Sequence, residues 1–167
     1  IEIRQELKNL GYSFVTDGDT EVLAIALKHW GMKALNKLEG MWSFAWYDDF
    51  TGELTLCRDR FGEKPLYLWR VKNGIYFGSE IKALVSLAGK KPEINKNHVI
   101  RYLVNGYRSL YKTKETFYIG VEELPISSYL KVIENSKEKP YVYWNSKVEL
   151  DKNITYNQAV KLSLIHI

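Results

Sequence analysis

The spacing of apolar residues predicts two helices in the first part of the chain. The first should stop at Gly11 and places these residues on one face: Ile3, Leu7 and Leu10. The second should end at Gly31, and its apolar face consists of Val22, Leu23, Ala26, Leu27 and Trp30. Asp19 stands where the N-cap of this second helix belongs, so its carboxylate is expected to cap the helix.

The period changes to two between residues 41 and 47, which predicts a strand. Large rings occupy one face: Trp42, Phe44 and Trp46. Mostly small groups occupy the other face, at Met41, Ser43, Ala45 and Tyr47. Both faces are predicted to be buried. A covered strand face made of small residues either receives a large partner or leaves room for something to pass.

The rest of the chain alternates between further strand and helix patterns. Strands are predicted at 53–58, 66–71, 75–78, 129–133 and 141–144. A helix capped by Ser79 should end at Gly89, a further helix should begin at Asn95, and residues 153–162 have a helical pattern. Asn73-Gly74 suits a tight type I′ turn between two of the strands. This order predicts an α+β fold in which helices cover a mainly antiparallel sheet.

Composition and charge exclude several classes of protein. The chain has 167 residues, enough for one domain, and 26% of them are charged, as in globular proteins. Its 24 basic and 20 acidic residues give a net charge of +4 with no continuous basic stripe, so no nucleic-acid partner is expected. No apolar run reaches the length of a membrane span, so no membrane partner is expected.

The cysteine and the histidines do not indicate a disulfide, a nucleophile or a metal site. The single cysteine, Cys57, excludes an intrachain disulfide and fits a reducing, cytoplasmic compartment. Because Cys57 lies inside a strand-like run, a buried, inert thiol is favoured over a nucleophile. The histidines, His29, His98 and His166, are far apart and lie near no carboxylate at ligand spacing, so no metal is expected and each should be satisfied or exposed.

Three local patterns stand out from ordinary packing. Acidic residues crowd the turn at 17–22, where Asp19 is either a plain cap or a ligand-binding carboxylate. Residues 58–67, RDRFGEKPLY, alternate charges with Gly and Pro between two strands. Such a loop is usually solvated, but its charges could equally form a paired network that holds a site. The third pattern, FGSEIKAL at 77–84, is a strand-to-helix junction.

Together with GMWSFAWYD at 40–48, these patterns resemble the class II glutaminase domain of asparagine synthetases. The resemblance covers residues 1–145 and departs from the family pattern at Ile126-Ser127, where Pro-Gly is expected. It implies an N-terminal-nucleophile hydrolase-type four-layer sandwich, with two antiparallel sheets between helices, here incomplete. Residues 146–167 would then be a linker and the start of an ATP-dependent synthetase domain, so that the chain is truncated at both ends.

The resemblance also implies roles for particular residues. A cysteine nucleophile, with its own α-amine as base, would precede residue 1, so the fragment itself is expected to be inactive. Asp19 would bind the α-amino group of glutamine, an attraction between ammonium and carboxylate that a water-shielded site strengthens. Met41 would face the passage for ammonia, and Arg58 and Asp59 would support the site.

The parent protein would pass ammonia from glutamine to an aspartyl adenylate and so make asparagine. ATP and Mg²⁺ would bind in the missing synthetase domain, and no cofactor is expected in this chain. Three matters stay open: an amidotransferase acting on another carboxylate, a non-catalytic glutamine-binding or interaction module, and whether the parent is a homodimer.

Overall fold

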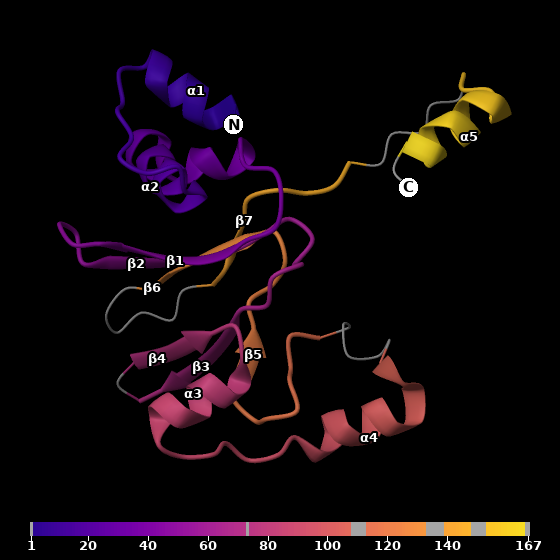
Figure 1. Cartoon of the computed structure of the whole chain (residues 1–167). Coiled ribbons are helices and arrows are strands. Elements are labelled where there is room, and N and C mark those ends of the chain that lie inside the picture. Colours follow the sequence, from indigo (N-terminus) through magenta and orange to yellow (C-terminus); the bar gives the residue numbers. More distant parts are fainter. Residues whose placement is uncertain (1, 73, 108–112, 133–138, 148–152, 166–167) are drawn as a thin grey trace.

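The structure, a computed structural model, describes residues 2–72, 74–107, 113–132, 139–147 and 153–165. Two antiparallel sheets lie between two layers of helices (Figure 1). On one side are α1 (Glu2–Asn9) and α2 (Asp19–Trp30), and on the other are α3 (Ile81–Ala88) and α4 (Lys96–Asn105). The predicted α+β class and the order of helices, sheet, sheet and helices are confirmed.

Each sheet combines a sequential hairpin with strands from later in the chain. The first has the order β1-β2-β6-β7 and consists of β1 (Ser43–Asp48), β2 (Glu53–Arg58), β6 (Ser128–Val132) and β7 (Tyr141–Val142). The second has the order β4-β3-β5 and consists of β4 (Gly74–Gly78), β3 (Tyr67–Val71) and β5 (Val121–Glu123). The chain therefore passes from the first sheet to the second through the loop after β2 and returns after β5.

The main core fills the space between the two sheets. Leu56 of β2 and Leu130 of β6 are register partners, so their side chains share the inner face of the first sheet. Leu66, Leu68 and Leu124 meet them from the second sheet and its flanks, and all five leucines are buried. This contact between inner faces is the apolar interface that a sandwich requires.

A second core lies between the first sheet and its helices. Leu7 of α1 and Leu27 of α2 are buried there, together with Ala34 of the 3₁₀ helix η1 (Gly31–Asn36). Phe44 and Trp46 of β1 pack against this cluster. The ring-bearing face of the strand is covered, as predicted, and the structure shows that the helices cover it.

The opposite face of β1 contradicts the prediction that both faces are buried. Met41 precedes the strand and is 62% exposed, Tyr47 is 59% exposed, and Ala45 is also exposed. The reason is that β1 is an edge strand, which in the described part of the chain pairs only with β2. None of its described residues packs against the leucine core, so this face stays exposed.

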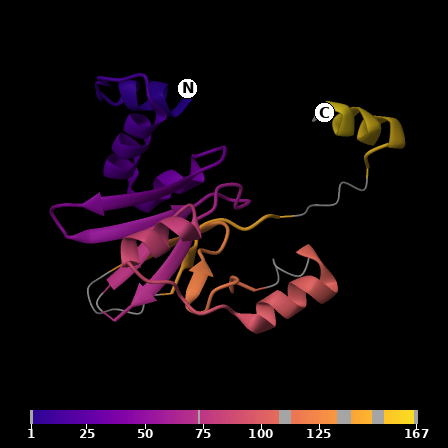
Figure 2. The same ribbon diagram turned by 60° about the horizontal axis from the view of Figure 1, so that its bottom comes forward.

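The predicted ends of the helices are confirmed. Gly31 follows α2 as its C-cap, and Gly89 follows α3 in the left-handed conformation with φ 65°. Asn95 caps α4, because its side chain accepts a hydrogen bond of 3.1 Å from the backbone N–H of His98. The 153–162 pattern becomes α5 (Tyr156–Ile165), which stands apart from the sheets (Figures 1 and 2).

Two predicted helix starts are wrong by one residue. Gly18 takes the N-cap position of α2 and Glu80 that of α3, so Asp19 is the first helical residue and Ser79 lies outside its helix. Neither capping residue makes a side-chain cap hydrogen bond. The predicted type I′ turn depends on Asn73, which lies outside the described residues. None of the helices in the described part of the chain has the length and apolarity needed to cross a bilayer.

We predict that Leu130→Ala destabilises the fold by about 2–5 kcal/mol, because it leaves a cavity in the core between the sheets. Leu130 is 0% exposed. The matched control is Leu87→Ala on α3, where the side chain is 67% exposed and the change should stay within about 0.5 kcal/mol. Urea unfolding of the two variants measures both values, and equal losses would contradict the assigned core.

Candidate functional site

Asp19 opens α2 with an exposed side chain. Within the described residues its carboxylate makes no hydrogen bond or ion pair, and it does not cap the helix. It lies at the amino end of the helix, where the backbone N–H groups and the helix dipole favour negative charge. The predicted cap role is therefore wrong, and the ligand-binding role stays a prediction.

The turn before Asp19 is held from both sides. The Glu21 carboxylate accepts hydrogen bonds from the backbone N–H groups of Val15 and Thr16, at 2.8 and 2.7 Å, and from the Thr16 hydroxyl at 2.7 Å. These bonds, that of Val15 first, hold the pKa of Glu21 below its ordinary value. The Arg4 guanidinium donates to the carbonyls of Thr16 and Gly18 at 2.7 and 2.9 Å. The sequence indicated only an acidic first turn here and did not reveal that Glu21 and Arg4 hold this turn by hydrogen bonds.

Arg58 is buried at the end of β2 and joins distant segments. Its guanidinium donates to the carbonyl oxygens of Gly62 at 2.7 Å, Lys64 at 2.9 Å and Leu124 at 2.9 Å. It also forms an ion pair of 2.9 Å with the Glu123 carboxylate of β5. The predicted alternative of a paired network is therefore confirmed for Arg58, in place of a solvated loop.

Asp59 adds a buried negative charge that accepts hydrogen bonds from the same loop. Its side chain is fully buried and accepts three backbone hydrogen bonds of 3.0 Å, from Phe61, Glu63 and Lys64. Burial by itself raises the pKa of the carboxyl, but the backbone N–H groups outweigh it and hold the pKa below its ordinary value. The Asp59 carbonyl also accepts the N–H of Ser127 at 2.8 Å, which ties the loop to the turn before β6.

Glycine is the residue that fits at position 62, between the side chains of Ile126 and Arg58. Its φ is +69°, and a side chain there would overlap Ile126 and come within 3.0 Å of the Arg58 guanidinium. Any other residue would therefore strain the loop and push Arg58 away from its acceptors. We call the set of Arg58, Asp59 and the loop 61–65 the β2 corner.

Cys57, the single cysteine, is unsuited to nucleophilic chemistry in this position. It is 0% exposed, and burial raises the pKa of its thiol to about 12. A nucleophilic cysteine needs an accessible thiolate near neutral pH. The predicted burial of Cys57 is confirmed, and its raised pKa agrees with the predicted inertness of the thiol.

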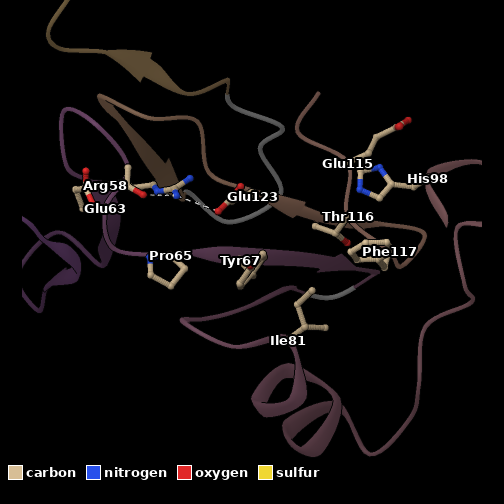
Figure 3. Close-up of a pocket in the computed structure, with 11 residues that line it drawn as sticks. Arg58, Glu63, Pro65, Tyr67, Ile81, His98, Glu115, Thr116, Phe117 and Glu123 are labelled. Carbon is tan, nitrogen blue, oxygen red and sulfur yellow. Dashed lines mark hydrogen bonds and ion pairs between the residues drawn. The ribbon is translucent and has the colours of Figure 1, made fainter. Parts of the chain in front are cut away.

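A cavity of about 320 Å³ lies beside the β4-β3-β5 sheet (Figure 3). The Arg58–Glu123 ion pair borders one part of it, and His98, Glu115 and Phe117 border another part. The remaining lining residues are Gly62, Glu63, Pro65, Tyr67, Ile81 and Thr116. The Nδ1 atom of His98 is buried without a hydrogen-bond partner in the described residues, so the expectation of a satisfied or exposed histidine is wrong at this position.

Comparison with known proteins identifies the domain. A family model described as "Glutamine amidotransferase domain" matches residues 1–144. The chain belongs to this family. The match covers both described sheets and helices α1 to α4, including the turn before Asp19 and the β2 corner, and it agrees with the predicted resemblance.

Curated relatives of this amidotransferase domain are much longer proteins. Asparagine synthetase (glutamine-hydrolysing) 1 of Bacillus subtilis is 41% identical over 103 residues, which are 62% of this chain and 16% of that protein. A putative asparagine synthetase (glutamine-hydrolysing) of Mycobacterium bovis is 36% identical over 136 residues, 79% of this chain and 20% of that protein. Amidase chry2 of Gibberella zeae is 29% identical over 134 residues, 80% of this chain and 19% of that protein. The chain therefore spans about a fifth or less of the length of these relatives.

The structure brings together only part of the predicted site. Arg58 and Asp59 share one network, whereas Asp19 begins the outer helix α2 and Met41 lies between η1 and β1. Within the described residues, no hydrogen bond or ion pair joins Asp19 or Met41 to the β2 corner. Sequence reasoning missed Glu123 as the partner of Arg58, and a signal existed in the acidic pair that precedes Leu124.

We predict that Asp59→Asn destabilises the amidotransferase domain by about 2–3 kcal/mol at pH 7. The substitution keeps the shape but points an N–H₂ group at backbone N–H donors, and each buried donor left unpaired costs about 1–3 kcal/mol. Because the folded pKa of Asp59 is depressed, its contribution is complete above the unfolded value of about 3.9 and is lost as pH falls further. The difference between wild type and variant should therefore shrink below about pH 4.

Urea unfolding at several pH values from 3 to 7 tests this prediction. The control is Asp49→Asn in the β1–β2 turn, where the side chain is exposed and the effect should stay within about 0.5 kcal/mol. A difference that stays constant down to pH 3, or no difference at pH 7, would show that Asp59 does not act as a buried anion.

Proposed function

We propose that this chain is the glutamine-binding part of a longer glutamine-hydrolysing amidotransferase, and that Asp19 anchors the α-amino group of glutamine. The family match over residues 1–144 and the names of the relatives support the general reaction class. The observation that carries the role of Asp19 is its position. An exposed carboxylate follows a turn whose path is fixed by Arg4 and Glu21.

The chemistry of that position fits an ammonium group. The Asp19 carboxylate has no partner within the described residues, so its oxygens are available to accept charge-assisted hydrogen bonds. The hydrogen bonds of Arg4 and Glu21 order the turn before a ligand binds. Less ordering free energy is therefore lost when the ammonium group binds than with a mobile carboxylate.

The nucleophile in this proposal is a cysteine outside the chain, as the resemblance to asparagine synthetases implies. Its thiolate would attack the amide carbon of the glutamine side chain, ammonia would leave, and water would release glutamate from the thioester. Cys57 cannot substitute for it, because its thiol is buried with a pKa raised to about 12. In the same proposal Met41 faces the ammonia passage, and the β2 corner supports the site without a chemical step of its own.

The acceptor of ammonia in the parent protein is proposed to be aspartate activated as an adenylate, in the cytoplasm. The printed names of two relatives favour asparagine, while the name of the third, an amidase, keeps another carboxylate open. Within the described residues, no group of three or more His, Cys, Asp or Glu side chains could hold a metal ion. The proposal places Mg²⁺ and ATP in the remainder of the parent, as the resemblance to asparagine synthetases implies.

We predict that Asp19→Ala raises the KM for glutamine at least tenfold in the full-length protein, equivalent to about 1.4 kcal/mol of lost binding. The carboxylate lost is the one proposed to pair with the ammonium group of the substrate. Initial rates of glutamate release at varied glutamine concentration measure the effect.

Asp17→Ala is the matched control, because Asp17 is an exposed carboxylate in the same turn and should leave KM unchanged. An Asp19→Ala enzyme with an unchanged KM would remove Asp19 from the site. A wild-type full-length protein that binds glutamine but releases no glutamate would favour the non-catalytic module.

A further inference from the structure

Arg4 on helix α1 reaches across to the turn that precedes α2. Its two terminal nitrogens donate to two different carbonyl oxygens, Nη1 to Thr16 at 2.7 Å and Nη2 to Gly18 at 2.9 Å. The Cζ atom of Arg4 also lies 4.5 Å from the centre of the Phe14 ring. A planar guanidinium that makes two hydrogen bonds and lies over a ring is held in one orientation. It therefore fixes the position of the turn relative to α1.

The hydrogen bond to Gly18 acts directly on Asp19. Gly18 is the N-cap of α2, with φ −73° and ψ 147°, and its carbonyl belongs to the peptide unit that contains the backbone nitrogen of Asp19. Because this unit is planar, fixing the carbonyl oxygen also fixes the direction of the N–Cα bond of Asp19. Asp19 is the first residue of the helix, so its own backbone is helical. Only the side-chain dihedral angles of Asp19 are then left to vary.

Glu21 holds the same turn from within α2. The Thr16 hydroxyl donates to the Glu21 carboxylate at 2.7 Å and accepts the backbone N–H of Gly18 at 3.3 Å. The carboxylate also accepts the backbone N–H groups of Val15 and Thr16. Among the described residues, none of these hydrogen bonds uses the oxygens of the Asp19 side chain. The network thus orders the turn and leaves the Asp19 carboxylate open to a ligand.

We propose that Arg4 is a positioning residue that makes the parent enzyme select substrates with an α-amino group. The proposal rests on the proposed role of Asp19 as the anchor of that group. A carboxylate that is already in place loses less ordering free energy when it pairs with an ammonium group. A substrate with the same side-chain amide but without the α-amino group gains nothing from this order. Arg4 therefore acts on selectivity and takes part in no chemical step.

Loss of Arg4 should loosen the turn without unfolding the domain. Thr16 and Gly18 are exposed, so water can hydrogen-bond to their carbonyl oxygens when the guanidinium is absent. The core beneath the turn consists of apolar contacts around Leu7 and Leu27, which these hydrogen bonds do not join. Kinetic measurements on an Arg4 variant are therefore expected to report on the turn.

Steady-state kinetics of the full-length protein with two substrates test the proposal. One substrate is glutamine, and the other is glutaramate, which is glutamine without its α-amino group. Ammonia release measures both reactions. In Arg4→Met the KM for glutamine should rise about threefold to tenfold, the range expected for reordering about one backbone residue on binding. The kcat for glutamine and the kcat/KM for glutaramate should stay at the wild-type values, because only binding of the α-amino group is weakened.

Lys37→Met is the matched control. Lys37 pairs with Glu6 at 2.7 Å and lies 4.7 Å from the centre of the Trp30 ring, in the same layer of helices but without a bond to the turn. Its loss should leave the kinetics of both substrates unchanged. Glu21→Gln disturbs the turn from its other side and should raise the KM for glutamine in the same selective way. This second variant tests the proposal even if Arg4→Met does not fold.

A combined variant, Arg4→Met with Asp19→Ala, separates positioning from other effects. Its KM for glutamine should equal that of Asp19→Ala alone, because a positioning residue has no effect once the anchor is gone. Additive losses, equal losses on both substrates, or an unchanged KM in Arg4→Met and Glu21→Gln overturn the proposal and leave the anchor standing. If Asp19→Ala alone keeps the wild-type selectivity for glutamine over glutaramate, the anchor and its positioning are both overturned.

Discussion

The rest of the structure depends on how two adjacent charges are satisfied at the β2 corner. Arg58 donates to three carbonyl oxygens and the Glu123 carboxylate, and Asp59 accepts three backbone N–H groups. Burying either charge without partners would cost several kcal/mol. Asp59 finds its partners within the crossing loop, whereas Arg58 reaches Glu123 of β5 and the carbonyl of Leu124. The charge of Arg58 is therefore fully satisfied only when the two sheets meet in this arrangement. Gly62 is the residue that lets the loop pass so close to Arg58.

The contact between the sheets at the β2 corner leaves their outer faces to be covered by helices. Once the sheets meet, leucines such as Leu56 and Leu130 fill the space between them, and the helices are left to cover the outer faces. The α1–α2 layer is well packed and carries the braced turn that presents Asp19. The α4 layer and the inner face of β1 stay open. The packed side thus holds the proposed ligand anchor, and exposed apolar side chains such as Leu103 and Met41 lie on the other sides.

The sequence predicted those features that depend on interactions between residues close together in the chain. The structure agrees with strand 53–58, with the helix ends at Gly31 and Gly89 and with a helix that begins at Asn95. Each of these follows from residues within one turn or one strand. The predicted cap role of Asp19 was wrong, because Gly18 takes the N-cap position after a turn that Arg4, distant in sequence, helps to hold. β5 was missed because it is only 3 residues long and pairs through long-range contacts. The burial of both faces of β1 failed for the same reason, since it depends on strands that neighbour it in space. The motifs at 58–67 and 77–84 still indicated the family, and the family model matches residues 1–144, which include both.

The central claim is that this domain serves glutamine hydrolysis with a nucleophile other than its own cysteine. Glutamate release from glutamine by the full-length protein, compared between wild type and Cys57→Ala, tests it most directly. The account predicts glutamate release in both, per folded molecule, because Cys57 is 0% exposed and its pKa is raised to about 12. Activity that disappears with Cys57, in a variant that folds normally, or a wild-type protein that releases no glutamate, would contradict the account.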